Sequence, residues 1–214
     1  MLGIHDLALF VLSGLLLNIT PGPDSLYIVG RSASQGWRAG ATAAFGVGSG
    51  TLVHVLAAAF GLSAILATSA AAFTVVKLLG AGYLLYVGVS LLRSRSSSVA
   101  AARGPVQRIA PATLWQIYSQ GFLTNLLNPK VALFFLAFVP QFIDPTAPNK
   151  PLAFVALGAI FDFNGMLWCN FLAWSAATAG ARLKGNARLA NILNRMTGCL
   201  FVGLGIKLVF ARQN

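Results

Sequence analysis

Six long apolar stretches constrain this chain more than any other feature of its sequence. They run approximately from Leu7 to Gly30, Ala39 to Leu66, Ala72 to Leu92, Thr113 to Phe142, Leu152 to Ala179 and Ile192 to Phe210. Several of them reach or exceed the length of about 20 residues that an α-helix needs to cross a bilayer. Only 9% of the 214 residues are charged, whereas soluble domains carry charge on roughly a quarter of their residues. The sequence therefore predicts an all-α integral membrane protein with six transmembrane helices in the lipid bilayer.

No long polar tract separates these stretches, so we expect a single transmembrane domain over residues 1–214. The first stretch has no basic segment before it, and Pro-Gly-Pro at residues 21–23 stands where a signal peptide would need small residues for cleavage. The first stretch is therefore predicted to be a retained helix.

The formal net charge of +11 indicates topology and not a nucleic-acid partner. Ten basic residues lie between stretches one and two, three and four, or five and six: Arg31, Arg38, Arg93, Arg95, Arg103, Arg108, Arg182, Lys184, Arg188 and Arg195. At most four belong to the opposite side: Lys77, Lys150, Lys207 and Arg212. Because cytoplasmic loops are enriched in Lys and Arg, the three Arg-rich loops are predicted in the cytoplasm and both termini outside it.

The sequence offers few side chains that could bind a metal or a cofactor. The two cysteines, Cys169 and Cys199, fall inside apolar stretches, where a free cysteine packs as a small hydrophobic residue. Of the two histidines, His5 is terminal and His54 is better explained as a packed, hydrogen-bonded side chain than as a proton carrier. With no H-x-x-x-H or C-x-x-C spacing, neither a metal nor a cofactor is predicted.

The chain contains a weak internal repeat. A polar residue stands directly before proline at Thr20-Pro21 and again at Asn128-Pro129, and glycine-rich segments recur at residues 79–88 and 197–205. Two three-helix repeats explain this pattern, the first over about 1–95 and the second over about 113–214, joined by a basic cytoplasmic loop at about 93–112. Because each repeat crosses the membrane an odd number of times, the second is predicted to be inverted relative to the first.

The two proline motifs predict that helices one and four are each broken. Proline inside a helix costs about 3 kcal/mol or more, but at the first position of a helix it is well tolerated. Thr20 and Asn128 are residue types that cap helix N-termini, so new half-helices are predicted to start near Pro21 and Pro129. Gly22 permits close backbone approach at the first break.

Breaks inside lipid are tolerated only where the freed backbone groups face protein or a watery cavity. In inverted repeats, the two new N-termini would point at one site near the midplane, where their N–H groups could receive a carboxylate. The alternative is a pair of proline kinks that only shape packing.

Charged residues inside the apolar stretches sharpen this hypothesis. Asp24, Asp162 and Lys130 lie well inside such stretches, whereas Asp6 and Asp144 lie at their edges. Ionisable residues inside a membrane are costly and are usually paired or functional. We expect Asp24 or Asp162 to face Lys130 across the cavity, or one carboxylate to hold a substrate ammonium while Lys130 and the N-termini hold its carboxylate. The alternative is a structural Asp–Lys pair that sets helix register.

A set of polar residues is thereby predicted to bind substrate, and it includes Asn164 in the fifth stretch. Its members are Asn18, Thr20, Pro21, Gly22, Pro23, Asp24, Asn125, Asn128, Pro129, Lys130, Asp162 and Asn164. Asp24 and Asp162 are also the candidates for proton coupling. For the fifth stretch, plain packing explains the polar residues equally well.

Several of these motifs together resemble the LysE/RhtB family of amino-acid exporters. The resemblance rests on Asn18 to Asp24, Gly36 to Gly40, Gly46 to Gly50, Gly121 to Lys130 and Phe134 to Phe142. It covers nearly the whole chain, and it implies a bacterial inner-membrane protein that exports amino acids or their derivatives with energy from the proton gradient. It does not fix the substrate.

The residues themselves also favour a carrier. The chain has no G-x-x-x-x-G-K-[ST] loop for ATP, so uphill transport must use an ion gradient, with two halves rocking around a midplane site. An intramembrane enzyme is disfavoured because the few acids and histidines are not clustered. A passive channel or a non-transporting membrane subunit remains the alternative. The small residues Gly46, Gly48, Gly50, Gly80, Gly82, Gly203 and Gly205 would let helices pack closely, which permits a homodimer without requiring one.

Overall fold

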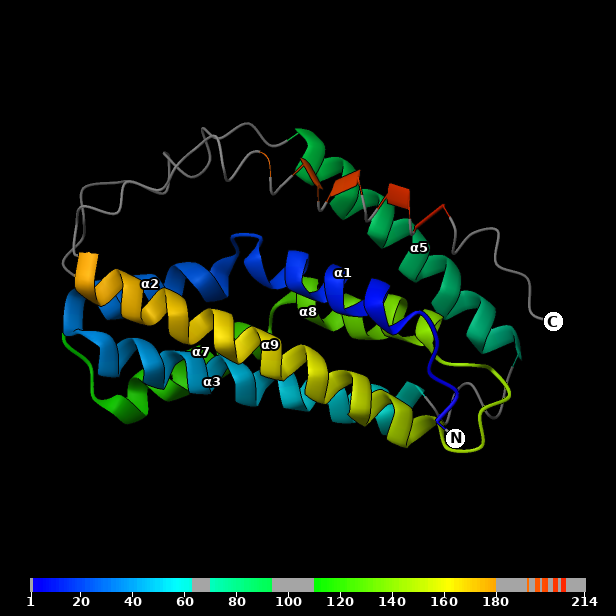
Figure 1. Ribbon diagram of the computed structural model, residues 1–214, viewed down its shortest axis with the longest axis horizontal. Helices are drawn as coiled ribbons and strands as arrows, with labels where there is room; N and C mark the ends of the chain where they lie inside the picture. Colours follow the sequence, from blue (N-terminus) through cyan, green and yellow to red (C-terminus); the bar gives the residue numbers. More distant parts are fainter. Residues whose placement is uncertain are drawn as a thin grey trace.

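The computed structural model describes residues 2–62, 70–93 and 110–179, together with isolated positions between 192 and 206. Within these ranges the chain is helical, without a β-strand (Figure 1). The α-helices are α1 (Leu7–Ile19), α2 (Pro23–Gln35), α3 (Trp37–Leu56), α5 (Ala70–Arg93), α7 (Leu114–Leu126), α8 (Pro129–Leu133) and α9 (Lys150–Ala179). Two π-helical segments, η1 (Ala57–Leu62) and η2 (Phe134–Phe138), and the 3₁₀ segment η3 (Val139–Phe142) extend α3 and α8.

These helices account for up to four membrane spans among the described residues. Trp37–Gly61 and Lys150–Thr178 are each long and apolar enough to cross a bilayer alone. Leu7–Ile19 with Pro23–Gln35 and Leu114–Leu126 with Pro129–Phe142 are long and apolar enough only when each bent pair is counted as one span, and they bend at their breaks by 52° and 47°. The helix α5 covers the third predicted stretch. The sixth lies largely outside the described residues, so the arrangement of six helices in two repeats stays a prediction.

The two bent pairs run in opposite directions along the molecule. In Figure 1 the chain passes from α1 to α2 toward the left, and from α7 to α8 toward the right. Between them, α3 packs against α2, α7 and α9, while α9 also packs against α1 and α2. The two breaks are thereby brought toward the middle of the molecule, where α9 and α3 both pass.

Glycines allow the closest of these helix contacts. A Cβ at Gly46 of α3 would collide with the backbone carbonyl of Tyr118, and a Cβ at Gly121 of α7 would lie 2.6 Å from the carbonyl oxygen of Ala43. Close helix approach is therefore confirmed for the α3–α7 contact. Gly82 of α5 and Gly203 have no heavy atom within 4 Å of such a Cβ, so the same expectation finds no support there.

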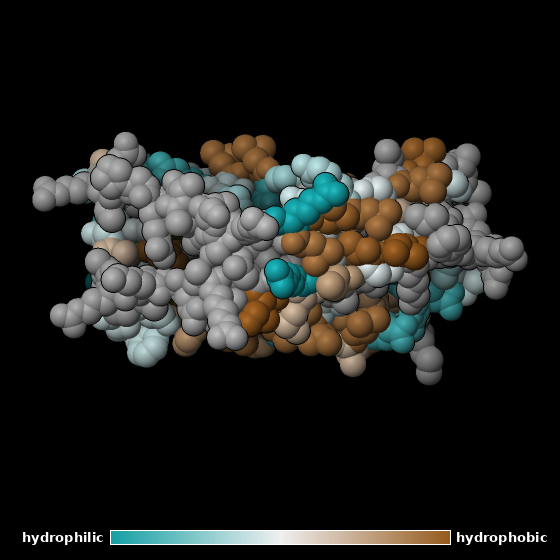
Figure 2. Space-filling model, turned by 90° about the horizontal axis from the view of Figure 1, so that it is seen from above, coloured by the Kyte–Doolittle hydropathy of each residue, from teal (hydrophilic) through white to brown (hydrophobic). Residues whose placement is uncertain are grey.

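Phenylalanine side chains fill the core between the break in α7–α8 and the end of the molecule where the N-terminus lies. Phe10, Phe134, Phe138 and Phe142 are each at most 2% exposed and stack with ring centroids 4.8–6.5 Å apart. Large apolar side chains also remain on the outer surface, as Figure 2 shows for the face on which α5 lies. Val75 and Leu78 of α5 are more than half exposed there, as expected for a surface that meets lipid.

The two ends of the molecule differ in charge. The α2–α3 turn, with Arg31 and Arg38 on either side of it, lies at the left end of Figure 1, together with the start of α7 and the end of α9. The N-terminal segment and the loop before α9 lie at the other end, where Asp144 accepts hydrogen bonds from the Thr146 hydroxyl and backbone N–H. These two bonds lower the pKa of the exposed Asp144 carboxyl.

Candidate functional site

The first helix break lies between Ile19 and Pro23. As predicted, the chain leaves the helix at the Thr-Pro motif, and the new helix starts near Pro21, two residues further on. Gly22 is the residue before α2, and Pro23 takes its first position. Thr20 stays with the last turn of α1, since its hydroxyl donates to the Leu16 carbonyl over 2.6 Å. The prediction that Thr20 caps the second half-helix is therefore wrong.

The second break follows the predicted geometry. Asn128 precedes α8, Pro129 takes the first position, and the Asn128 side chain accepts a hydrogen bond from the Lys130 N–H over 3.0 Å. The next N–H, of Val131, donates to the Asn128 carbonyl over 3.2 Å. These bonds occupy the N–H groups that were expected to face a ligand at this break. At the start of α2, by contrast, no hydrogen bond of the Asp24 or Ser25 N–H groups occurs within the described part of the chain.

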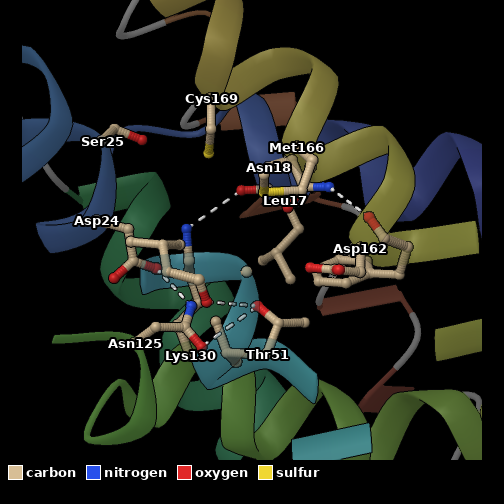
Figure 3. A pocket seen from close by; sticks show the side chains of 15 residues that line it. Leu17, Asn18, Asp24, Ser25, Thr51, Asn125, Lys130, Asp162, Met166 and Cys169 are labelled. Carbon is tan, nitrogen blue, oxygen red and sulfur yellow. Dashed lines mark hydrogen bonds between the residues drawn. The ribbon is translucent and has the colours of Figure 1, made fainter. Parts of the chain in front are cut away.

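Both breaks border one cavity (Figure 3). Its lining comes from α1, α2, α3, α7, α8 and α9: Leu17, Asn18, Asp24, Ser25, Val47, Gly48, Thr51, Asn125, Lys130, Val131, Phe161, Asp162, Gly165, Met166 and Cys169. The cavity volume is about 40 Å³, which is room for roughly three water molecules. The cavity is therefore small, and both halves of the chain contribute to its wall.

Asp24 is fixed in this cavity by two amides of the other half. Asn125 Nδ2 and Asn128 Nδ2 donate to the same carboxylate oxygen, Oδ2, over 3.0 and 2.9 Å. The other oxygen, Oδ1, is buried and has no hydrogen-bond partner among the described residues. A buried acceptor without a partner is costly, so Asp24 offers a ready acceptor to a donor that enters the cavity.

Asn125 is itself held from α3. Its side-chain oxygen accepts from the Thr51 hydroxyl over 3.3 Å, and its backbone carbonyl lies 3.1 Å from His54 Nε2. His54 is hydrogen-bonded, as predicted from the sequence. The chain of contacts from α3 through Asn125 to Asp24 fixes the direction in which the free oxygen points.

Lys130 finds its partners at the first break. Its ammonium donates to the carbonyl oxygens of Leu17 and Thr20 over 3.2 and 3.3 Å. Asp24 and Asp162 line the same cavity, but within the described ranges neither forms a direct ion pair with Lys130. The expectation that an aspartate and Lys130 share the cavity agrees with this lining. The alternative, a structural Asp–Lys pair, is wrong, because the lysine side chain reaches the end of α1 instead.

The structure divides the predicted site residues into two groups. Asn18, Asp24, Asn125, Lys130 and Asp162 line the cavity. Seven others do not: Thr20, Pro21, Gly22, Pro23, Asn128, Pro129 and Asn164. Of these, Asn128 contacts Asp24, and a Cβ at Gly22 would lie 3.2 Å from Lys130 Nζ. Asn164 lies on α9, and its side chain makes no hydrogen bond in the described chain.

Sequence reasoning missed Ser25, Thr51, Met166 and Cys169 as lining residues. The spacing of Asp162, Gly165, Met166 and Cys169 is i, i+3, i+4, i+7, which places them on one face of a helix. That spacing could have extended the predicted site from Asp162 along α9. It also moves Cys169, expected to pack as a core residue, to the wall of the cavity.

Known proteins resemble this chain over nearly its whole length. A family model described as LysE type translocator matches residues 15–212. An uncharacterized membrane protein of Pseudomonas aeruginosa is 34% identical over 98% of the chain and 97% of its own length. A leucine efflux protein of Salmonella typhimurium is 29% identical over 96% and 95%, and one of an Enterobacter species is 30% identical over 96% of both chains. No solved structure matches.

Proposed function

The chain belongs to the family of LysE type translocators, and from this premise we propose that it exports neutral amino acids, or close derivatives, from the bacterial cytoplasm. It is a membrane transporter and not an enzyme. The observation that carries the proposal is the cavity between the two helix breaks, which is lined by Asp24, a carboxylate whose Oδ1 has no partner in the described part of the chain. The names of the leucine efflux relatives support an amino-acid substrate.

An amino acid carries an ammonium and a carboxylate on adjacent atoms, and the start of α2 offers a receptor for each. We assign the ammonium to Asp24 Oδ1, which lacks a partner in the described chain. The carboxylate would bind the N–H groups of Asp24 and Ser25 and the Ser25 hydroxyl, at the positive end of the helix dipole. Ser25 lines the cavity, so both receptors face the same space.

The rest of the lining favours an aliphatic side chain on the substrate. Leu17, Val47, Val131, Phe161 and Met166 supply apolar surface, and Met adapts its shape to different apolar groups. The cavity of about 40 Å³ is too small for such a side chain beside an amino-acid backbone. Substrate therefore enters when the two halves move apart, and the described form is the closed one.

Alternating access supplies this movement in our proposal. Six helices in two inverted repeats would rock around the cavity, which opens in turn to the cytoplasm and to the outside of the inner membrane. The Arg-rich loops would be cytoplasmic and both termini external. The uphill step would be driven by protons, with Asp24 and Asp162 as titratable groups in the cavity.

Transport by purified protein in proteoliposomes tests this function. Vesicles are loaded with labelled leucine, lysine or glutamate, and efflux is measured with and without an imposed pH gradient. We expect saturable leucine efflux that the gradient accelerates at least tenfold, and little efflux of the two charged amino acids. Efflux that does not saturate and ignores the gradient would identify a passive channel instead.

A further inference from the structure

Lys130 occupies an electrostatically unfavourable place in its own helix. It is the second residue of α8, where the positive end of the helix dipole repels a cation. Its side chain leaves this environment and reaches across to α1, where the ammonium donates to the Leu17 and Thr20 carbonyls over 3.2 and 3.3 Å. The negative end of a helix dipole favours a cation.

The proline motif creates this acceptor site. In a continuous helix the Leu17 carbonyl would accept from the N–H of residue 21, and that residue is Pro21, which has no N–H. The same break places the Thr20 carbonyl beyond the last residue of α1. Gly22 leaves room for the ammonium, since a Cβ there would lie 3.2 Å from Nζ. The break therefore builds a cation site and clears the space beside it.

In transporters with broken helices, unwound carbonyls and half-helix C-terminal ends bind the coupling cation. Here the ammonium of the chain itself occupies that place. We propose that Lys130 is the coupling residue of this exporter: its ammonium is a tethered cation at the end of α1, and loss and gain of its proton link proton entry to substrate exit. This inference rests on the proposed function and extends it to a residue that the sequence placed only in substrate binding.

The proton step balances in the following way. When the cavity opens to the cytoplasm, one N–H bond of the ammonium breaks, the proton passes to a cavity water, and the nitrogen keeps the electron pair. The neutral amine binds the α1 carbonyls more weakly than the ammonium does. When the cavity opens to the outside, the amine takes a proton from water and the contact forms again, so one proton enters per cycle.

Lys130 is better placed for this role than Asp162 is. Its ammonium joins α8 of one half to α1 of the other, so its charge changes a contact between the halves. Coupling requires such a difference between conformations. The Asp162 carboxylate makes no hydrogen bond within the described ranges, so its protonation changes no such contact there.

Few other titratable groups face this site. Asp24 of α2 and Asp162 and Cys169 of α9 line the cavity with Lys130. The lining residues from α1, α3 and α7 are not titratable. The helix α5 packs against α8, but its described titratable residues Tyr86 and Arg93 are not part of the lining.

The variant Lys130→Arg separates charge from titration. Arg keeps the positive charge and the donors but does not lose its proton in proteins. The full-length protein is reconstituted, and two activities are measured with labelled leucine: exchange at equal concentrations on both sides, and uphill transport driven by an imposed pH gradient. For Lys130→Arg we expect exchange that stays above that of empty vesicles, and uphill transport reduced at least tenfold. Lys150→Arg, outside the cavity, serves as the matched control and should match the wild type in both.

Uphill transport by Lys130→Arg at the wild-type level would overturn the inference. Equal loss of exchange and uphill transport in folded protein would also overturn it, because that result would assign Lys130 to substrate binding. Wild-type protein that exchanges leucine but ignores the gradient would refute the proton coupling of the proposed function itself.

If Lys130→Arg does not fold, Pro21→Ala tests the same idea. It gives the Leu17 carbonyl an N–H that competes with the ammonium, so we expect uphill transport to fall more than exchange. An unchanged ratio of the two activities would contradict the inference.

Discussion

Asp24 uses its two carboxylate oxygens differently. Two amides from the other half of the chain donate to Oδ2, while Oδ1 is buried without a partner in the described chain. The amides fix the carboxylate, and in the proposed function its other oxygen receives the substrate ammonium. This is the arrangement expected of a group that binds a donor present only part of the time.

Replacing Asp24 by Asn tests this arrangement at the scale of one residue. The shape is kept, but the charge and one acceptor are lost, and a hydrogen bond to a charged group contributes about 1.5–3 kcal/mol. We expect the half-saturating leucine concentration for efflux to rise about 10- to 100-fold, with the protein still inserted in the membrane. Initial efflux rates over a range of leucine concentrations measure the change.

Asp144→Asn is the matched control for this substitution, because Asp144 is an exposed aspartate at the end of the molecule. It should leave efflux unchanged. Wild-type efflux by Asp24→Asn would remove Asp24 from substrate binding.

The residues at the breaks could be predicted from sequence, but their partners could not. Asp24 and Lys130 stand out because ionisable side chains are rare inside apolar stretches. Their charges predict that an aspartate faces Lys130 across the cavity, with a structural Asp–Lys pair as the alternative. The actual acceptors of Lys130 are backbone carbonyls 110 and 113 positions away in sequence, and nothing in the side-chain pattern marks them except the proline that frees one of them.

At the scale of helices, the α3–α7 contact relies on residues without side chains. We predict that Gly46→Ala destabilises the protein, because the added Cβ would collide with the carbonyl of Tyr118. Overpacking of this kind costs about 1–3 kcal/mol. The melting temperature of the purified protein in detergent should fall by several degrees.

Gly82→Ala is the control for this change, because Gly82 is also in the middle of a helix but has open space around a Cβ. Its melting temperature should stay the same or rise, since Ala favours helix more than Gly does. Equal destabilisation by both changes would show that helix propensity, and not the close contact, decides the outcome.

The helix breaks could be predicted from the sequence. The exact end of each helix, and the side of it that faces the cavity, were harder to predict. Asn128 and Pro129 form the expected start of α8 because Asn favours the position before a helix and Pro favours its first position. At the first break both Pro21 and Pro23 are suited to the first position of α2, and Pro23 takes it. The π-helical segments η1 and η2 have no local signal, and the cavity-facing side of α9 depends on how it packs against α1 and α3.

At the scale of the whole molecule, the cavity is closed by different means toward the two ends. Phenylalanines pack toward the N-terminal end. The other end is the one where the α2–α3 turn lies. Toward it, Arg31 donates to the Gln120 side chain over 2.8 Å and to the Ala110 carbonyl over 3.1 Å. Tyr27 donates to the Ile117 carbonyl over 2.9 Å. These bonds join α2 to α7 and to the residues before it, and in the proposed transport cycle they would have to break for this end to open.

Cys169 reports on this opening because its thiol lies in the wall of the closed cavity (Figure 3). In a Cys199→Ser background, which removes the exposed second thiol, we predict that Gln120→Ala speeds alkylation of Cys169 by a water-soluble maleimide. The change removes an acceptor of Arg31 and of Tyr27.

If the closed form loses about 2 kcal/mol of stability, the population of the open form rises about 30-fold. The alkylation rate, followed by mass spectrometry, should therefore rise at least tenfold. Excess leucine should lower it again. Gln141→Ala is the control, because the Gln141 side chain donates to the Ala137 carbonyl, four residues earlier in the chain, and to no other described residue. If both variants react at the same rate as the parent, the contacts of Arg31 and Tyr27 do not keep this end closed, and the path to the cavity must open elsewhere.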